Sequence, residues 1–334
     1  MSSNDSRYKR QLLVNKLGPN AQQKLSDARV LIVGAGGLGS PTSLLLAGAG
    51  VGKITLVDPD TVSLSNLHRQ ILFGESDIGK FKSTAGQQRL RDLNSEIEIK
   101  AINEALIVDN AERLVSQATV VVDAADNFLV SYLLSDLCLE KRIPLVSASV
   151  LTTHGYLGVF CGTRDKPAPS LRAVFPAPSS DINNCNSAGV TGPSVGIIGS
   201  YQAQEVLKVI VQSDSQLLGK LMNLDLWDYR QYIIDFNESQ EPKQKAKIVS
   251  LSQLNQQSLL LDVRGQQEVD DDPIINTQFA GSIKHIPLDQ LNDRLNELEP
   301  NTTICCICKS GQRALNSAQR LIDNGYNDVL VSSR

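Results

Sequence analysis

The segment ARVLIVGAGGLGS, residues 28–40, decides the fold of the first part of the chain. An apolar run leads into Gly34, Gly36, Gly37 and Gly39, and a segment of helical period follows. Glycine permits a tight turn and lets backbone N–H groups approach a phosphate at the beginning of a helix. The pattern predicts a nucleotide-binding strand, loop and helix of an α/β fold.

Short β-branched runs recur along the first two thirds of the chain, and segments of helical period separate them. The predicted strands are residues 28–36, 53–58, 97–102, 119–126, 143–150, 155–161 and 220–226. The predicted helices are residues 40–48, 83–93, 129–141 and 195–211. Apolar strands that alternate with helices indicate a Rossmann-like, mainly parallel sheet with both faces covered.

A polar segment divides the chain into two predicted domains, as its length of 334 residues suggests. We expect a first domain over 1–236, a linker over 237–247 and a smaller α/β domain over 248–334. The linker sequence, NESQEPKQKAK, has no apolar period. In the second domain we predict strands at 259–264 and 302–307, and helices at 288–298 and 312–324.

Composition and charge exclude several classes of protein. The formal net charge is -4 and no dense stripe of Lys and Arg occurs, which argues against nucleic acid as a partner. No apolar run reaches membrane-spanning length, and the N-terminus does not resemble a signal peptide. We therefore expect a cytoplasmic protein, without a membrane segment, whose six cysteines are reduced.

Charged residues around the glycine loop indicate which nucleotide it holds. Asp58 ends the strand after the loop, where an acid usually binds ribose hydroxyls, and these features alone also fit NAD(P). Arg69 and Lys82 follow, and cations beside the loop suit a triphosphate and a departing pyrophosphate. Asp126 ends a later strand at the same edge of the sheet, where a carboxylate suits magnesium.

Five motifs together resemble the MoeB/ThiF/HesA family, the bacterial relatives of ubiquitin-activating enzymes. They are RYKRQ (7–11), GAGGLGS (34–40), DPDTVSLSNLHRQ (58–70), GKFK (79–82) and DAADN (123–127), and the resemblance covers about 6–236. It implies adenylylation of the C-terminal glycine of a ubiquitin-like sulfur-carrier protein that ends in Gly-Gly. It also implies that ATP and magnesium are held by the glycine loop with Asp58, Ser65, Asn66, Leu67, His68, Arg69, Lys82, Asp126 and Asn127.

The resemblance has further implications for subunits, metal and thiols. Arg10 matches the family arginine that reaches the ATP of the other subunit, which implies a homodimer. Relatives carry two CxxC pairs for structural zinc, but residues 168–171 read APSL and the tail from 237 to 247 has no cysteine, so we expect no zinc.

Cys185 matches the loop cysteine that relatives link covalently to the carrier. An inert loop cysteine remains the alternative, because no neighbouring His or Lys activates it.

Three further cysteines lie close together near the end of the chain. Cys305 and Cys306 alternate with isoleucines in a strand and should point to opposite faces of a core. Cys308 opens the motif CKSGQRA (308–314), which leads from the strand into a helix. Backbone N–H groups, Arg313 and the helix N-terminus there would favour a thiolate or persulfide.

The Cys308 motif belongs to a wider pattern. With LDVR (261–264), Glu268 and AGSI (280–283), it resembles a single rhodanese domain. Such domains usually continue through a glycine pair and a final helix, so a C-terminally truncated domain is one expectation.

The two resemblances combined predict a fusion of the MoeZ type. After adenylylation, a persulfide on Cys308 would attack the activated carbonyl and yield a thiocarboxylate, with Cys185 as acceptor or resolving thiol. The sulfur donor would be a cysteine desulfurase or thiosulfate, and the pathway could be molybdopterin synthesis, thiamine synthesis, tRNA thiolation or another. Two alternatives are an NAD(P)-dependent oxidoreductase and a non-catalytic carrier-binding adaptor.

Overall fold

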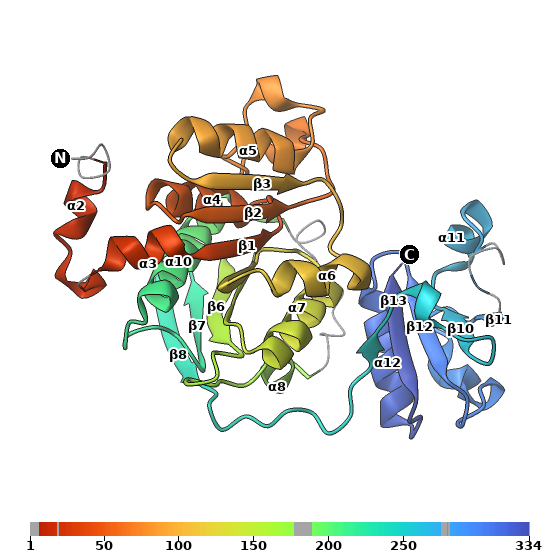
Figure 1. Cartoon of the computed structure of the whole chain (residues 1–334). Coiled ribbons are helices and arrows are strands. Elements are labelled where there is room, and N and C mark those ends of the chain that lie inside the picture. The colour runs from red at the N-terminus through yellow and green to blue at the C-terminus, as the bar shows by residue number, and fades with distance from the viewer. Residues whose placement is uncertain (1–6, 19, 177–188, 275–278, 280, 334) are drawn as a thin grey trace.

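The computed structural model of the chain describes residues 7–18, 20–176, 189–274, 279 and 281–333. They form two α/β units, each built around its own sheet (Figure 1). None of the helices in this part of the chain has the length and apolarity that crossing a membrane would require.

The first sheet has eight strands in the order β3-β2-β1-β4-β5-β6-β7-β8. The strands are β1 (Arg29–Val33), β2 (Lys53–Val57), β3 (Glu98–Ile102), β4 (Val120–Asp123), β5 (Leu145–Leu151), β6 (His154–Phe160), β7 (Lys220–Asp225) and β8 (Arg230–Asp235). Strands β1 to β5 pair in parallel, whereas β5 to β8 pair as antiparallel neighbours. The predicted α/β class with a mainly parallel sheet is confirmed.

Helices cover both faces of this sheet because the strand side chains alternate between two apolar clusters. Ile32 and Leu56 face the cluster that includes side chains of α4, α5 and α10, whereas Leu31 and Val57 face the one that includes α6 and α7. The helices are α2 (Lys9–Leu12), α3 (Ala21–Asp27), α4 (Gly39–Gly48), α5 (Lys82–Leu93), α6 (Val108–Val115), α7 (Phe128–Lys141), α8 (Leu171–Val174) and α10 (Gly192–Val211). Burial of these apolar side chains stabilises the unit.

The second sheet has five parallel strands in the order β11-β10-β12-β13-β9. They are β9 (Lys247–Ile248), β10 (Leu259–Asp262), β11 (Ser282–His285), β12 (Ile304–Cys308) and β13 (Val329–Ser333), accompanied by α11 (Gln266–Asp271) and α12 (Gln312–Asp323). Helix α12 contacts α7 of the first unit, and Figure 1 shows the two helices facing each other across the boundary.

Several local predictions differ from the structure. Residues 288–298 were predicted as a helix, but 291–297 form 3-10 turns with a break at Arg294. The leucines of this segment pack in the core, as a helix of this sequence would also allow, but 3-10 turns are common in such short segments. Helix α6 and strand β8 were not predicted. Strand β8 is exposed at every position and so lacks an alternating pattern of burial.

Candidate functional site

The glycine loop after β1 is shaped by close contacts that exclude side chains. Gly34 has φ +98°, and a Cβ there would lie 2.5 Å from the Ala124 carbonyl oxygen. A Cβ on Gly39 would lie 1.9 Å from the Gly34 carbonyl oxygen. A Cβ on Gly37 would lie 2.6 Å from Cγ1 of Val195, at the beginning of α10. The loop is therefore held tightly between β4 and α10.

Gly36 differs from the other loop glycines because it faces a polar side chain that lacks a partner. The nearest atom to a Cβ on Gly36 would be Nε2 of Gln70, at 3.6 Å. Gln70 is only 4% exposed, and its Oε1 has no hydrogen-bond partner in the described part of the chain. Buried polar atoms are normally satisfied, so this acceptor beside the loop fits a donor group of a bound nucleotide. Sequence reasoning missed Gln70, although it ends the motif over 58–70.

Asp58 supports the loop from beneath. Its Oδ2 accepts a hydrogen bond of 2.7 Å from the Ala35 N–H, and its Oδ1 accepts one of 2.9 Å from the Asp60 N–H. Burial raises the pKa of the carboxyl group, against the opposing effects of Lys82 and the two N–H donors. A carboxylate retains further lone pairs, so Asp58 can hold the loop and still accept from a ribose hydroxyl.

Lys82 begins α5 and presents a buried ammonium group beside Asp58. Its Nζ lies 2.8 Å from Oδ2 of Asp60, whose side chain is largely exposed. A phosphate group would compete with Asp60 for this cation. Asp60 was not predicted as a site residue, even though it stands between Asp58 and the rest of the motif.

The segment that follows is ordered by its own hydrogen bonds. Oδ1 of Asn66 accepts from the Ser63 N–H at 3.1 Å. The Ser65 carbonyl accepts from Nη1 of Arg69 at 3.1 Å and lies 3.0 Å from Nδ1 of His68. The exposed His68 ring thus makes polar contacts within the segment.

Packing contacts also hold this segment in place. Leu67 is half-buried and packs against the apolar cluster beneath α4 and α10. The beginning of α10 lies against the same segment, since a Cβ on Gly192 would lie 2.4 Å from the His68 carbonyl oxygen.

The end of β4 carries three polar residues with different surroundings. Asp126 is exposed, whereas Asp123 is buried, and burial raises the pKa of Asp123 to about 6. Asn127 caps α7, because its Oδ1 accepts from the Leu129 N–H at 2.8 Å. Its Nδ2 donates to the Ser310 carbonyl at 2.8 Å, so both polar atoms of the predicted ATP contact already have protein partners.

The topology gathers these residues at one edge of the sheet. In the register, Val33 is paired with Val57 on one side and with Asp123 on the other. The glycine loop, Asp58 and Asp126 therefore follow the carboxyl ends of adjacent parallel strands, where α/β sheets usually bind ligands.

Arg10 lies apart from this edge in its own chain. It is exposed on α2, at the end of the molecule away from the second unit (Figure 1).

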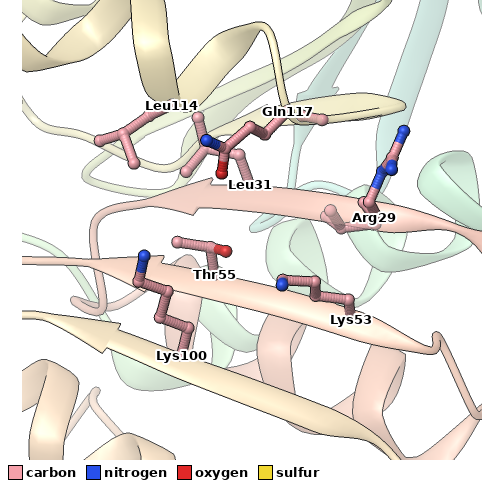
Figure 2. A pocket seen from close by; sticks show the side chains of 9 residues that line it. Arg29, Leu31, Lys53, Thr55, Lys100, Leu114 and Gln117 are labelled. Atoms are coloured by element: carbon pink, nitrogen blue, oxygen red, sulfur yellow. The ribbon is translucent and has the colours of Figure 1, made fainter.

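Two pockets lie at the opposite, amino ends of the strands. Figure 2 shows Arg29, Lys53 and Lys100 around the first, which has a volume of about 230 Å³. The second, of about 470 Å³, is lined by Thr119 and Pro144 among others. None of the predicted nucleotide residues lines either pocket.

Polar contacts connect the two segments, 168–171 and 237–247, in which relatives carry CxxC pairs. Ser170 donates from its N–H and its Oγ to the Glu241 carboxylate, at 2.8 and 2.6 Å. Arg172 pairs with Asp136 at 3.0 Å, and its guanidinium lies over the Tyr132 ring. No group of three or more His, Cys, Asp or Glu side chains is arranged to hold a metal within the described ranges. Cys185 lies outside the described residues.

Cys308 is the last residue of β12 and is fully buried, so the prediction that it lies in the loop is wrong. The strand continues one residue further because Cys308 pairs with Ser333 of β13. Its Sγ accepts a hydrogen bond of 3.4 Å from the Ala314 N–H at the beginning of α12. Cys305 and Cys306 face separate apolar clusters on opposite sides of the sheet, as predicted.

Arg313 lies beside Cys308 and is paired with an acid. Its Nη1 and Nη2 are 2.5 and 2.7 Å from the Glu268 carboxylate oxygens. The Glu268 carboxylate and, to a smaller extent, the Cys308 thiol raise the pKa of Arg313. Arg313 in turn lowers the pKa of Glu268 to about 2.

The fold and the two sites define a class: an α/β unit with a glycine-rich loop at the carboxyl edge of its parallel strands, followed by a smaller α/β unit with a buried cysteine at the end of a strand. Residues 8–255 match the ThiF family, and residues 246–333 match the rhodanese-like domain. The chain belongs to the ThiF family.

Named relatives and solved structures support this assignment. The chain is 44% identical over 222 residues to adenylyltransferase and sulfurtransferase MOCS3 of Culex quinquefasciatus, covering 66% of the chain and 50% of that protein. It is 41% identical over 204 residues to sulfur carrier protein ThiS adenylyltransferase of Escherichia coli strain K12, covering 61% of the chain and 80% of that protein. The structure of E. coli MccB with ATP matches with a TM-score of 0.60 and 25% identity, over 70% of this chain and 72% of that one.

The chain spans about half the length of the MOCS3 relatives from mosquitoes that it matches.

Proposed function

We propose that the chain adenylylates the C-terminal glycine of a ubiquitin-like sulfur-carrier protein and then transfers sulfur to it. The proposal rests on the arrangement at the carboxyl edge of the first sheet. There the glycine loop, Asp58 and Lys82 meet the Gln70 Oε1, which has no partner among the described residues. Membership in the ThiF family and the names of the relatives support the choice of reaction.

In the first step, a carboxylate oxygen of the carrier's terminal glycine attacks the α-phosphorus of ATP. A bond forms between this oxygen and phosphorus, the bond to the β-phosphate oxygen breaks, and pyrophosphate leaves with its electron pair. Lys82 and Arg69 stabilise the charge that develops on the phosphate oxygens. Asp126 would hold a magnesium ion, which would supply further positive charge to the phosphates.

The second step begins with sulfur loading on Cys308. Its thiolate attacks the outer sulfur of thiosulfate, with loss of sulfite, or the persulfide of a cysteine desulfurase, with loss of the desulfurase thiolate. Arg313 lies beside this sulfur and places a positive charge next to it. The product is a persulfide on Cys308.

The persulfide then attacks the adenylylated carbonyl and expels AMP, which joins the carrier to Cys308 through a disulfide. The Cys185 thiolate attacks Sγ of Cys308, and the carrier leaves as a thiocarboxylate. A Cys185–Cys308 disulfide remains, and a dithiol reductant must reduce it before the next cycle.

The proposed assembly is a cytoplasmic homodimer in which Arg10 acts on the ATP of the other subunit. Arg10 stands beside exposed apolar side chains, with Leu12 at 52%, Leu13 at 74% and Val14 at 49% exposure. A second copy would cover this surface, because contiguous exposed apolar groups favour association. Structural zinc is not expected.

ATP–pyrophosphate exchange with a carrier that ends in Gly-Gly tests the first step. Lys82→Met should lower the exchange rate by roughly two or more orders of magnitude, because it removes a charge from the transition state. Lys80→Met is the matched control, since the exposed Lys80 pairs with Asp77 and should leave the rate unchanged. Equal exchange rates in both variants, or no exchange in the unmodified protein, would contradict the proposal.

A further inference from the structure

The loop that follows Cys308 lies directly on the first unit. The Ser310 carbonyl accepts a hydrogen bond of 2.8 Å from Nδ2 of Asn127. Gly311 has φ +81°, and a Cβ there would lie 2.3 Å from Cδ2 of Leu129. The loop backbone therefore packs against the beginning of α7 with no space for a side chain.

Asn127 makes hydrogen bonds to both units. Its Oδ1 caps α7 through the Leu129 N–H, and its Nδ2 reaches across to the other unit. Asn127 also follows Asp126, at the edge of the sheet where the proposed nucleotide site lies. One side chain thus connects this edge to the loop that carries the proposed sulfur-transfer motif.

Cys308 has no exposed surface while its loop lies on α7. The thiol is held at the end of β12, and the Ala314 N–H at the start of α12 donates to it. A sulfur donor or an alkylating reagent must reach Sγ, so the loop has to move before the thiol can react.

We propose that Asn127 is a positioning residue that docks the 309–311 loop on α7, and that docking shields Cys308 from reagents. The proposal rests on the proposed function, in which Cys308 carries the sulfur. Docking keeps the loop next to Cys308 at the edge of the proposed nucleotide site, and release of the loop exposes the thiol for loading.

The test uses the full chain without nucleotide or carrier. Asn127→Asp keeps an acceptor that can cap α7 but removes the donor to Ser310. Alkylation of Cys308 by iodoacetamide, located by peptide mass spectrometry, should become about fivefold faster, as expected for loss of one neutral hydrogen bond. Leu129→Ala, which removes the apolar contact without adding charge, should change the rate in the same direction.

Asn110→Asp is the matched control. Asn110 also accepts from a backbone N–H at the beginning of a helix, that of Ile107 at 3.0 Å, and donates to a carbonyl, that of Ala105 at 2.9 Å. Both partners lie in the first unit, so this variant should leave the Cys308 rate unchanged. If Asn127 served only as a helix cap, Asn127→Asp would likewise leave the rate of Cys308 alkylation unchanged.

Unchanged Cys308 alkylation in both Asn127→Asp and Leu129→Ala would overturn the proposal, as would equal acceleration in Asn110→Asp. Slow alkylation of Cys305 and Cys306 in every variant is the internal check that the sheet stays folded. Failure of the proposed function would appear as absent pyrophosphate exchange in the unmodified protein. The alkylation result does not depend on that exchange.

Discussion

At the scale of single residues, contacts between distant segments determine which positions of the glycine loop require glycine. Gly37 faces Val195 of α10, and Gly36 faces Gln70. The glycine spacing alone predicted the loop and its place after β1. It could not reveal Val195 or Gln70 as neighbours, because these residues approach only when α10 and the 58–70 segment pack.

The contact between Gly37 and Val195 predicts that a second substitution at Val195 compensates for one at Gly37. Gly37→Ala would bring a Cβ to 2.6 Å from Cγ1 of Val195, which should destabilise the fold by about 1–3 kcal/mol and reduce pyrophosphate exchange. Adding Val195→Ala removes the clashing methyl group and should restore much of both properties. Urea unfolding and exchange assays would measure this. A double variant no better than Gly37→Ala would show that the contact is not the cause.

Asp123 gives a prediction about pH. Burial raises its pKa from the usual 3.8 to about 6, so the folded state binds a proton more tightly than the unfolded state. This contribution to stability is complete below pH 3.8 and is lost as pH rises through about 6. Asp123→Asn should therefore gain stability relative to the unmodified protein between pH 5 and pH 8, by roughly 1–3 kcal/mol. Urea unfolding of both proteins at the two pH values measures the difference, and a constant difference would contradict the assignment.

At the scale of elements, the sequence predicted the strands of the first sheet that carry apolar runs. The runs that became β1, β2 and β4 are apolar on both faces, so their type and position could be inferred without a partner. Strand β8 could not be inferred, because its exposed side chains give no pattern and its pairing with β7 determines its conformation. The site edge was predictable from parallel strands that end together, whereas the docking of Ser310 on Asn127 was not.

Contacts between the start of α8 and the segment before β9 stand where the family resemblance implies metal-binding cysteines in relatives. Glu241→Ala should leave the buried Ser170 hydroxyl without its acceptor and lower the free energy of unfolding by about 1–3 kcal/mol. Glu238→Ala is the control, because Glu238 is exposed in the same polar segment. Urea unfolding distinguishes the two. Equal, small effects in both variants would mean that the contact with Ser170 contributes little.

At the scale of the whole molecule, the two units are joined by more than the polar segment between them. Asn127 bonds to Ser310, Lys245 pairs with Asp136 at 2.6 Å, and α12 packs on α7. A motif search finds each unit separately and contains no information on these contacts. The arrangement brings the proposed adenylation edge and the proposed sulfur loop into one neighbourhood, which a relay of one carrier between two reactions requires.

The proposed dimer gives the last prediction, because Arg10 and Lys82 would complete the same site from different chains. Arg10→Ala and Lys82→Met chains should each be inactive in pyrophosphate exchange. Mixed, dissociated and reassembled in equal amounts, they should recover about a quarter of the unmodified rate, since about half of the dimers are mixed and each has one intact site. Two Arg10→Ala preparations treated alike should recover nothing. If Arg10 acted within its own chain, each site of the mixed dimer would lack one residue and no activity would return. The recovered rate therefore tests both the dimer and the partner's contribution to the site.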